Sequence, residues 1–229
     1  MPKLYSYCIP FDDGAAPNPY WGICTLVICK PVIRRTANVD DWIVGTGSAN
    51  SPIGDISGHV VYAMRVTDKM TMAHYDAYTY RDLPAKVPMW THRDVRRRLG
   101  DSIYDFSTHE PAQRCPSVHG PGNVARDLRG QYALLSEHFY YFGDKPMRLP
   151  DDLQPIVHQG QGHRVHLNAP YVERFVSWID NFGYKPNTLV GRPQLDLFKD
   201  ETRIKACAAQ RAREADEDES MSNSGCGEG

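Results

Sequence analysis

The sequence lacks the features that place a chain in or across a membrane. None of its 229 residues belongs to an apolar run that approaches the roughly 20 residues of a membrane-spanning helix. The first residues, MPKLYSYCIPFDDG, contain no apolar core long enough for a secretion signal. We therefore expect a cytoplasmic protein with no membrane partner.

Paired cysteines and a metal-binding motif are also missing. The six cysteines are scattered, and the nearest two, Cys24 and Cys29, are five residues apart rather than in a CxxC pair. Without a secretion signal, such cysteines are expected to be reduced thiols. His163 and His166 have no nearby acidic ligand, so we predict no metal site, and the sequence identifies no cofactor.

Two catalytic signatures are absent as well. The chain contains no GxSxG nucleophile elbow, which disfavours a serine hydrolase. The HxE and PCxxC strings of zinc deaminases are missing, and the Cys115-Pro116 pair does not replace them. A Walker A loop and a GxGxxG fingerprint do not occur either.

Charge is nearly balanced along most of the chain. The net charge is −2, but residues 200–229 hold eight acids and four bases, which leaves 22 bases and 20 acids in residues 1–199. This balance does not by itself predict nucleic-acid binding, although it permits a local basic patch. We expect a single α+β domain over 1–199 and an acidic, disordered tail over 200–229.

The pattern of the chain predicts several short strands and few helices. Aromatic and β-branched runs predict strands at 3–9, 23–29, 42–44, 59–68, 132–135 and 138–142. Helices are expected at 70–82, 149–156 and 169–183, the last with Asn168 as its N-cap. Because no βαβ alternation is visible, we predict a small mixed β-barrel or curled sheet with peripheral helices.

Residues 18–48 form the first candidate binding segment. Basic side chains follow the apolar run 23–29, and tryptophans flank them: Lys30, Arg34 and Arg35, with Trp21 and Trp42. Arginines bind phosphate and aromatic rings stack on bases, so the segment favours a nucleotide ligand. Aromatic residues also dominate protein cores, which is the structural alternative.

A glycine-containing turn is expected at the end of the same segment. Gly45, Thr46, Gly47 and Ser48 follow a short strand, and their backbone amides would be open to a phosphate or carbonyl. The alternative is a connection that needs glycine only for its backbone angles.

The second candidate segment, 119–129, reads HGPGNVARDLR. His119 and Asp127 are candidate acid/base groups, and Asn123, Arg126 and Arg129 are candidate ligand-binding residues. An internal salt bridge between Asp127 and Arg129 is the alternative. The third segment, GQGHRVH at 160–166, adds His163 as a candidate acid/base and Arg164 as a candidate binding residue.

The strings CKPVIRR, WIVGTGS, NVARDLRG and GQGHR make the chain resemble a known family over about residues 3–198. This is the nucleotide-modification-associated domain family, the second of the domains given that name. The resemblance implies a link to phage and bacterial systems that modify DNA bases, with a nucleotide, modified base or DNA as ligand and DNA-modification proteins as partners. It supplies no catalytic residues. The strand and turn at DDWIVGTG also resemble PUA-like (ASCH and EVE) barrels, which bind modified bases.

Three hypotheses remain open. The first is a domain that binds a nucleotide or modified base between Trp21 and Trp42, above the two arginines and the glycine turn. The second is an enzyme that modifies or hydrolyses a nucleotide or base, with His119, Asp127 or His163 as acid/base groups and arginines that hold phosphate. The third is a protein-interaction scaffold.

Overall fold

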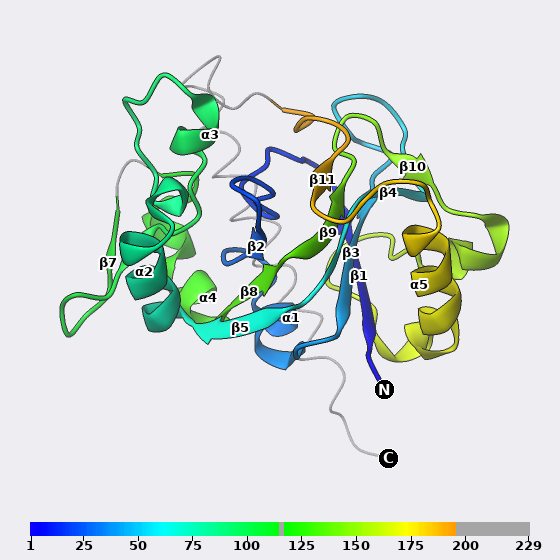
Figure 1. The fold of residues 1–229 in the computed structure, drawn as a ribbon, viewed down its shortest axis with the longest axis horizontal. Coiled ribbons are helices and arrows are strands. Elements are labelled where there is room, and N and C mark those ends of the chain that lie inside the picture. The colour runs from blue at the N-terminus through cyan, green and yellow to red at the C-terminus, as the bar shows by residue number, and fades with distance from the viewer. Residues whose placement is uncertain (115–116, 196–229) are drawn as a thin grey trace.

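A six-stranded mixed sheet forms the centre of the molecule in the computed structural model, which describes residues 1–114 and 117–195 (Figure 1). Its strands are, in spatial order, β1 (Leu4–Ile9), β3 (Trp42–Gly47), β4 (His59–Arg65), β9 (His138–Tyr141) and β11 (Thr188–Leu189), and β10 (Met147–Arg148) pairs with β4. The β1–β3 and β9–β11 pairs are parallel, and the other pairs are antiparallel.

A second, three-stranded antiparallel sheet packs beside the first. It consists of β2 (Cys24–Leu26), β8 (Tyr132–Ser136) and β5 (Asp68–Thr71). The chain passes directly from β4 to β5 and from β8 to β9, so the two sheets are joined where these strands meet. A short hairpin of β6 (Tyr104–Asp105) and β7 (Ala112–Gln113) lies apart from both.

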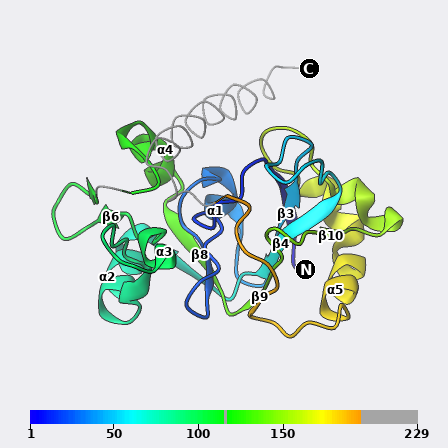
Figure 2. The ribbon, with the colours of Figure 1, turned by 90° about the horizontal axis from the view of Figure 1, so that it is seen from above.

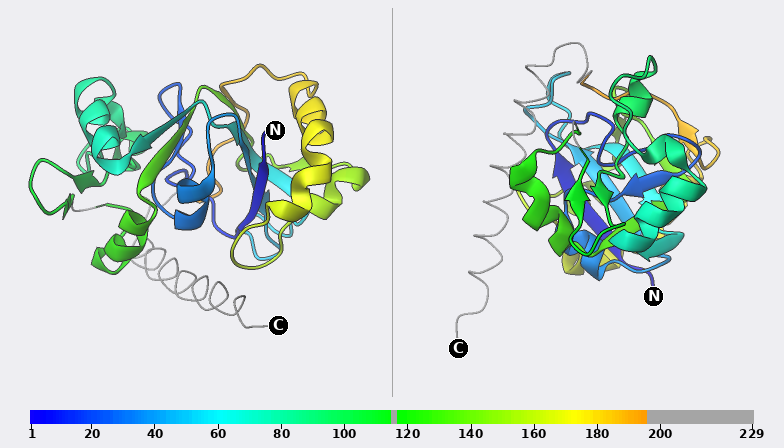
Figure 3. Two further views of the ribbon diagram at one scale, coloured as in Figure 1. Left: turned by 90° about the horizontal axis from the view of Figure 1, so that it is seen from below. Right: turned by 90° about the vertical axis from the view of Figure 1, so that its left-hand side faces the viewer.

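Helices pack around this pair of sheets, and one of them, Pro31–Thr36, lies between the two (Figures 2 and 3). The α-helices are α1 (Pro31–Thr36), α2 (Met72–Arg81), α3 (Val95–Arg98), α4 (Val124–Arg129) and α5 (Val172–Asp180). Short 3₁₀ helices occur at Pro84–Lys86, Pro121–Asn123, Asp151–Ile156 and His166–Tyr171. In the left view of Figure 3, α5 (yellow) and α2 (teal) lie at opposite ends of the molecule.

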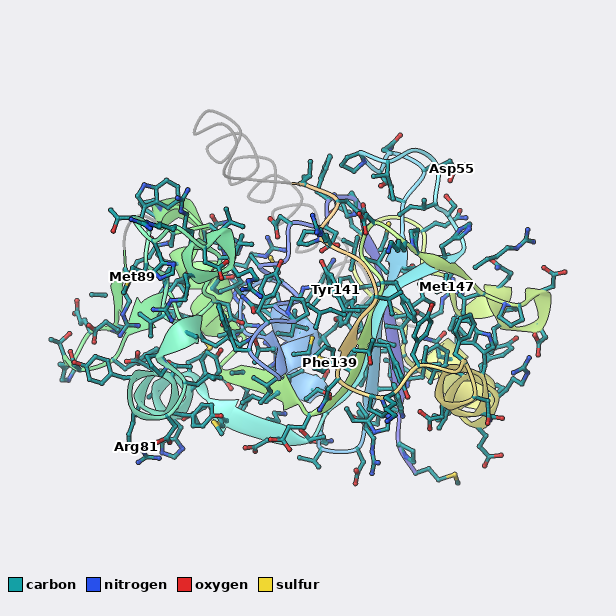
Figure 4. The ribbon with its side chains drawn as sticks, turned by 45° about the horizontal axis from the view of Figure 1, so that its top comes forward. Asp55, Arg81, Met89, Phe139, Tyr141 and Met147 are labelled. Atoms are coloured by element: carbon teal, nitrogen blue, oxygen red, sulfur yellow. The ribbon has the colours of Figure 1, made fainter. Side chains whose placement is uncertain are left out.

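Alternation along the central strands builds two apolar layers. In β1, Tyr5, Tyr7 and Ile9 join the core between the two sheets, whereas Leu4 joins the core under α5. The same alternation places Phe139 and Tyr141 of β9 in the middle of the molecule, where Figure 4 labels them. A third core lies between the small sheet and α2.

The α+β class is confirmed, but the expected barrel is not found. Within residues 1–114 and 117–195, neither sheet closes on itself, so the described structure has several open sheets with a few helices. The prediction that the chain has no βαβ units was wrong in detail. Both parallel pairs are linked by crossovers that contain a helix, α1 between β1 and β3 and α5 between β9 and β11. The predicted tail at 200–229 lies outside the described residues.

Two local predictions also need correction. Gly45, Thr46 and Gly47 lie inside β3 and pair with β1, because their missing or small side chains allow Ile9, Tyr62 and Ile56 to pack closely. Asn168 is not a helix N-cap. It lies within the 3₁₀ turn before α5, and its side-chain amide donates to Leu4 O (3.0 Å) and Ser6 Oγ (2.9 Å).

Candidate active site

Cys29 occupies a strained bend between β2 and α1. The φ angles of Cys29 and Lys30 are 62° and 41°, in the left-handed region that non-glycine residues rarely adopt. Two such residues in succession cost about 1–3 kcal/mol each, and strain of this kind concentrates at functional sites. A strand, a nucleophile with a strained backbone and a helix follow one another here, as in the elbows of hydrolases.

The Cys29 thiol contacts a histidine, which in turn contacts an aspartate. Sγ lies 3.4 Å from His119 Nε2, and His119 Nδ1 donates to Asp127 Oδ2 at 2.5 Å. The second carboxylate oxygen of Asp127 accepts from Cys29 N at 3.1 Å, so the aspartate fixes both the imidazole and the backbone of the bend. A nucleophile, a base and a group that orients the base are the three parts of a catalytic triad.

A buried arginine holds this triad together. Arg34 is fully buried, and its guanidinium donates to Cys29 O (2.8 Å), Asp127 O (2.5 Å) and Tyr132 O (3.0 Å). Burial lowers its pKa to about 10, while Asp127 opposes that change. Gly130 makes room for the guanidinium, because a Cβ at that position would lie 2.2 Å from Arg34 Cζ.

The charges of His119 and Asp127 support each other. Both side chains are fully buried. Burial alone would lower the pKa of His119, but the Asp127 carboxylate and the Cys29 sulfur outweigh burial and raise the pKa to about 10. Burial would likewise raise the pKa of Asp127, but His119 and Arg34 hold it below its usual range. At neutral pH the pair is therefore an imidazolium and a carboxylate.

Tyr104 completes the hydrogen bonds of the carboxylate. Its hydroxyl donates to Asp127 Oδ2 at 2.8 Å. We refer to Cys29, His119, Asp127, Arg34 and Tyr104 as the thiol cluster.

The thiol cluster opens into a cavity of about 460 Å³, here called the thiol pocket. Cys29 and Lys30 line it together with the carboxyl ends of β1 and β3, where open α/β sheets bind ligands. Tyr7 and Phe11 give the pocket aromatic surface, and the Lys30 ammonium lies 4.9 Å from the centre of the Tyr7 ring. Arg126 and the 159–161 loop form another part of the wall.

Comparison with known families now identifies the group to which the chain belongs. A family model described as nucleotide modification associated domain 2 matches residues 1–200. The chain belongs to this family. Membership associates it with nucleotide modification. No curated protein and no solved structure gives a significant match.

In this nucleotide modification associated domain, the three candidate segments meet at one pocket. Lys30 comes from the first segment, Arg126 from the second, and Gly160 and Gln161 from the third. Gly47 and Ser48 also line the pocket, whereas Gly45 and Thr46 are buried in β3. His119 and Asp127, both expected as acid/base groups, lie directly behind Cys29.

Other candidate residues lie away from the pocket wall. Trp42 is buried against His138 and Phe175 under α5, and Trp21 stacks with Arg96 on the α3 side. Arg34 is internal, and Arg35 is exposed on α1. The expected pocket between the two tryptophans is therefore not where the cavity lies.

The remaining candidates have local contacts. His163 packs against Tyr5, with ring centres 5.9 Å apart, and is not part of the thiol cluster. Arg164 pairs with Ser6 through two backbone hydrogen bonds, which fix the 158–165 loop to the edge of β1. Asn123 is buried and accepts from Gly120 N (3.1 Å), and Arg129 is exposed on α4. The alternative ion pair between Asp127 and Arg129 does not occur, because the Asp127 carboxylate faces His119 and Tyr104.

Cys29 is the candidate site residue that sequence reasoning missed. The available signal was its position directly before Lys30-Pro31, where an apolar strand ends and a helix begins. Among the described residues, no group of three or more His, Cys, Asp or Glu side chains is arranged to hold a metal ion. No helix within that part of the chain is both long and apolar enough to cross a membrane.

Proposed function

We propose that this chain is a cysteine-dependent enzyme of nucleotide modification, which transfers or hydrolyses a group on a nucleotide or base. The observation that carries this proposal is the line from Cys29 Sγ through His119 to Asp127 at the wall of a cavity. A purely structural cysteine does not require a buried histidine–carboxylate pair or two residues with positive φ.

The geometry supports a two-step reaction. The Cys29 thiolate attacks an electrophilic carbon of the substrate, an S–C bond forms, and the bond from that carbon to the leaving group breaks. His119 Nε2 donates its proton to the leaving group, while Asp127 holds the imidazole in place. Water or an amine then attacks the same carbon, His119 takes up the proton of that nucleophile, and the S–C bond breaks to restore the thiolate.

The pocket has the chemistry of a nucleotide site. Tyr7 and Phe11 offer rings for a base, and Lys30 and Arg126 offer positive charge for phosphate. A volume of about 460 Å³ lies within the usual range of small-ligand sites. We further propose that the modified nucleotides belong to DNA in phage or bacterial systems, alongside partner proteins of DNA modification.

The competing function is binding without turnover, for which the same aromatic and basic walls would suffice. It differs from the enzyme in one respect: it does not need the thiol. The test is therefore a comparison of Cys29→Ala with Cys8→Ala. Cys8 lines the same pocket, but its thiol faces Gly47 O at 3.8 Å.

Two measurements separate the functions. The first is the rate of iodoacetamide alkylation at each thiol, followed by peptide mass spectrometry. We expect Cys29 to react at least about tenfold faster than Cys8 at neutral pH, and His119→Asn to remove that advantage. The second is the nucleoside mass spectrum of DNA from cells that express each variant. Cys29→Ala should abolish any product, a loss of about 10³-fold or more, whereas Cys8→Ala should retain it. Equal alkylation of both thiols together with unchanged nucleosides in every strain would leave binding as the function.

A further inference from the structure

A second and larger cavity lies between the α3 region and the chain that follows β11. Its volume is about 850 Å³. Three cations from separate parts of the sequence line it: Arg96, Lys145 and Arg192. All three residues are exposed, and we call this cavity the arginine groove.

Arg96 is held in a fixed position at the wall of the groove. Its guanidinium makes a two-pronged contact with Asp94, at 3.0 Å from Nε to Oδ1 and 2.6 Å from the terminal nitrogen to Oδ2. The same guanidinium lies 5.0 Å from the centre of the Trp21 ring. Contact with one carboxylate and one indole orients the planar group while leaving part of it open to solvent.

The surroundings of the groove carry more positive than negative charge. Residues 92–98 contain four arginines and one acid, Asp94. The other acid of the groove, Asp144, accepts the backbone N–H of Arg192 at 2.8 Å. Both acids thus contact the arginines of the groove, and the basic residues outnumber them. A polyanion is the ligand that this arrangement favours.

Residues 194 and 195, at the groove, contact the chain beside the thiol pocket. Ser51, next to the 48–50 wall of the thiol pocket, donates to Gln194 Oε1 at 2.8 Å. Leu195 N, at the groove, donates to Asp12 O at 2.9 Å, and Phe11 beside it lines the thiol pocket. These two contacts connect the wall of the thiol pocket to the wall of the groove within the described residues.

We propose that the arginine groove binds the phosphate backbone of a nucleic-acid strand, and that one nucleotide of this strand enters the thiol pocket. The second half of this statement rests on the proposed function, whereas the first does not. Backbone contacts position a strand without reading its sequence, and a base must leave its stack before an enzyme can act on it. The substrate is accordingly a polynucleotide and not a free nucleotide.

The test compares two triple variants of the full chain. Arg96→Ala/Lys145→Ala/Arg192→Ala removes three positive charges from the groove. The matched control, Arg148→Ala/Arg174→Ala/Lys185→Ala, removes three exposed charges that do not line the groove. The probe is a fluorescein-labelled single-stranded DNA of about 12 nucleotides, a length that suits a groove of this kind. Its binding is followed by anisotropy at several salt concentrations.

We expect the groove variant to bind the probe at least about tenfold more weakly. The slope of log K against log salt should fall by about 2, since each phosphate contact on a single strand contributes about 0.7. The control should change affinity by less than about threefold. Alkylation of Cys29 by iodoacetamide should be unchanged in both, which shows that the variants are folded.

Three outcomes overturn the proposal: equal loss of affinity in the two triple variants, no loss in the groove variant, or equally tight binding of polyglutamate. If Cys29→Ala leaves nucleoside products unchanged while the groove variant loses DNA binding, the groove stands and the enzymatic proposal fails.

Discussion

Two clusters of buried polar and charged side chains include residues of the short segment 25–29, which begins in β2. The thiol cluster begins at Cys29. The second, here called the lysine cluster, begins at Thr25 and comprises Lys86, Asp101, Thr25, Asn18 and Tyr75. Lys86 and Asp101 are both fully buried.

The lysine cluster is closed by hydrogen bonds. Lys86 Nζ donates to the two oxygens of Asn18, to Ile23 O and to Thr25 Oγ1, at 2.8–3.0 Å. Asp101 accepts from Thr25 Oγ1 (2.5 Å) and from the Tyr75 hydroxyl (2.6 Å). Burial lowers the pKa of Lys86 to about 8, against the opposing effect of Asp101.

The difference between the clusters is access to a cavity. Cys29 lines the thiol pocket, whereas no member of the lysine cluster lines either cavity described here. Buried charge alone is therefore a poor marker of chemistry. A buried pair becomes a candidate active site when it ends in a nucleophile that a ligand can reach.

The largest effect is expected when Lys86 is removed from the lysine cluster. Lys86→Met leaves the buried oxygens of Asn18 and Ile23 without their donor and removes the positive charge that opposes the effect of burial on Asp101. It should lower the free energy of unfolding by about 3–5 kcal/mol. Urea unfolding measures this loss. Exposed Lys185→Met is the control, with a change within about 0.5 kcal/mol. A loss below about 1 kcal/mol for Lys86→Met would mean that the lysine is not held as the structure indicates.

A smaller effect is expected when Arg34, which holds the thiol cluster together, is displaced. Gly130→Ala pushes a methyl group into the Arg34 guanidinium and should cost about 1–3 kcal/mol of stability. Because Arg34 holds Cys29 O and Asp127 O, the alkylation rate of Cys29 should fall as well. Gly122→Ala is the matched control, since a Cβ there meets nothing within 4 Å. Equal behaviour of the two variants in unfolding and alkylation would remove Arg34 from the site.

The contributions of the two clusters to stability should change in opposite directions with pH. His119 has a folded pKa of about 10 against the usual 6.5, so its stabilisation is complete below about pH 6.5 and is lost as the pH rises through 10. Lys86 has a folded pKa of about 8 against the usual 10.5. Between these values the unfolded chain binds more protons at this lysine, so its contribution to stability increases with pH.

Urea unfolding at steps from about pH 7 to about pH 10 tests these two signs. His119→Asn should remove a contribution to the free energy of unfolding that decreases as the pH rises. Lys86→Met should remove a contribution that increases as the pH rises. Each slope is at most about 1.4 kcal/mol per pH unit. If both variants change the slope in the same direction, one of the two assignments of charge is wrong.

The smallest effect is expected from two matched substitutions that each remove one tyrosine hydroxyl. Tyr104→Phe removes the donor to Asp127, and Tyr75→Phe removes the donor to Asp101. Each should lower the free energy of unfolding by about 0.5–1.5 kcal/mol, because each carboxylate keeps another hydrogen-bond donor. Only Tyr104→Phe should also change the alkylation rate of Cys29. A change of that rate in Tyr75→Phe would show that the two clusters are coupled.

The sequence predicted much of the secondary structure because the local signals were strong. The runs at 3–9 and 138–142 are rich in aromatic and β-branched residues, and they form β1 and β9. Gly45–Gly47 was misjudged because glycine usually indicates a turn. In this fold the glycines serve the close approach of Ile9, Tyr62 and Ile56, which no local pattern contains.

The site could be predicted only in part. His119 and Asp127 were identified because titratable side chains in a glycine-rich loop indicate acid/base chemistry. Cys29 was not, because its partners His119 and Asp127 lie 90 and 98 residues further along the chain. Arg34 was predicted to hold phosphate, but its burial depends on Gly130 and on strand β8, which are equally distant in sequence.

The long separation between Cys29 and His119 also has a consequence during synthesis. The thiol leaves the ribosome 90 residues before its base, a delay on the order of ten seconds at ordinary rates of translation. Throughout that interval the nascent chain holds Cys29 as an ordinary cysteine, without the imidazole or the carboxylate that would activate it. Under the proposed function, the thiol becomes reactive only when the second half of the domain has docked, so an incomplete chain released early carries no activated thiol.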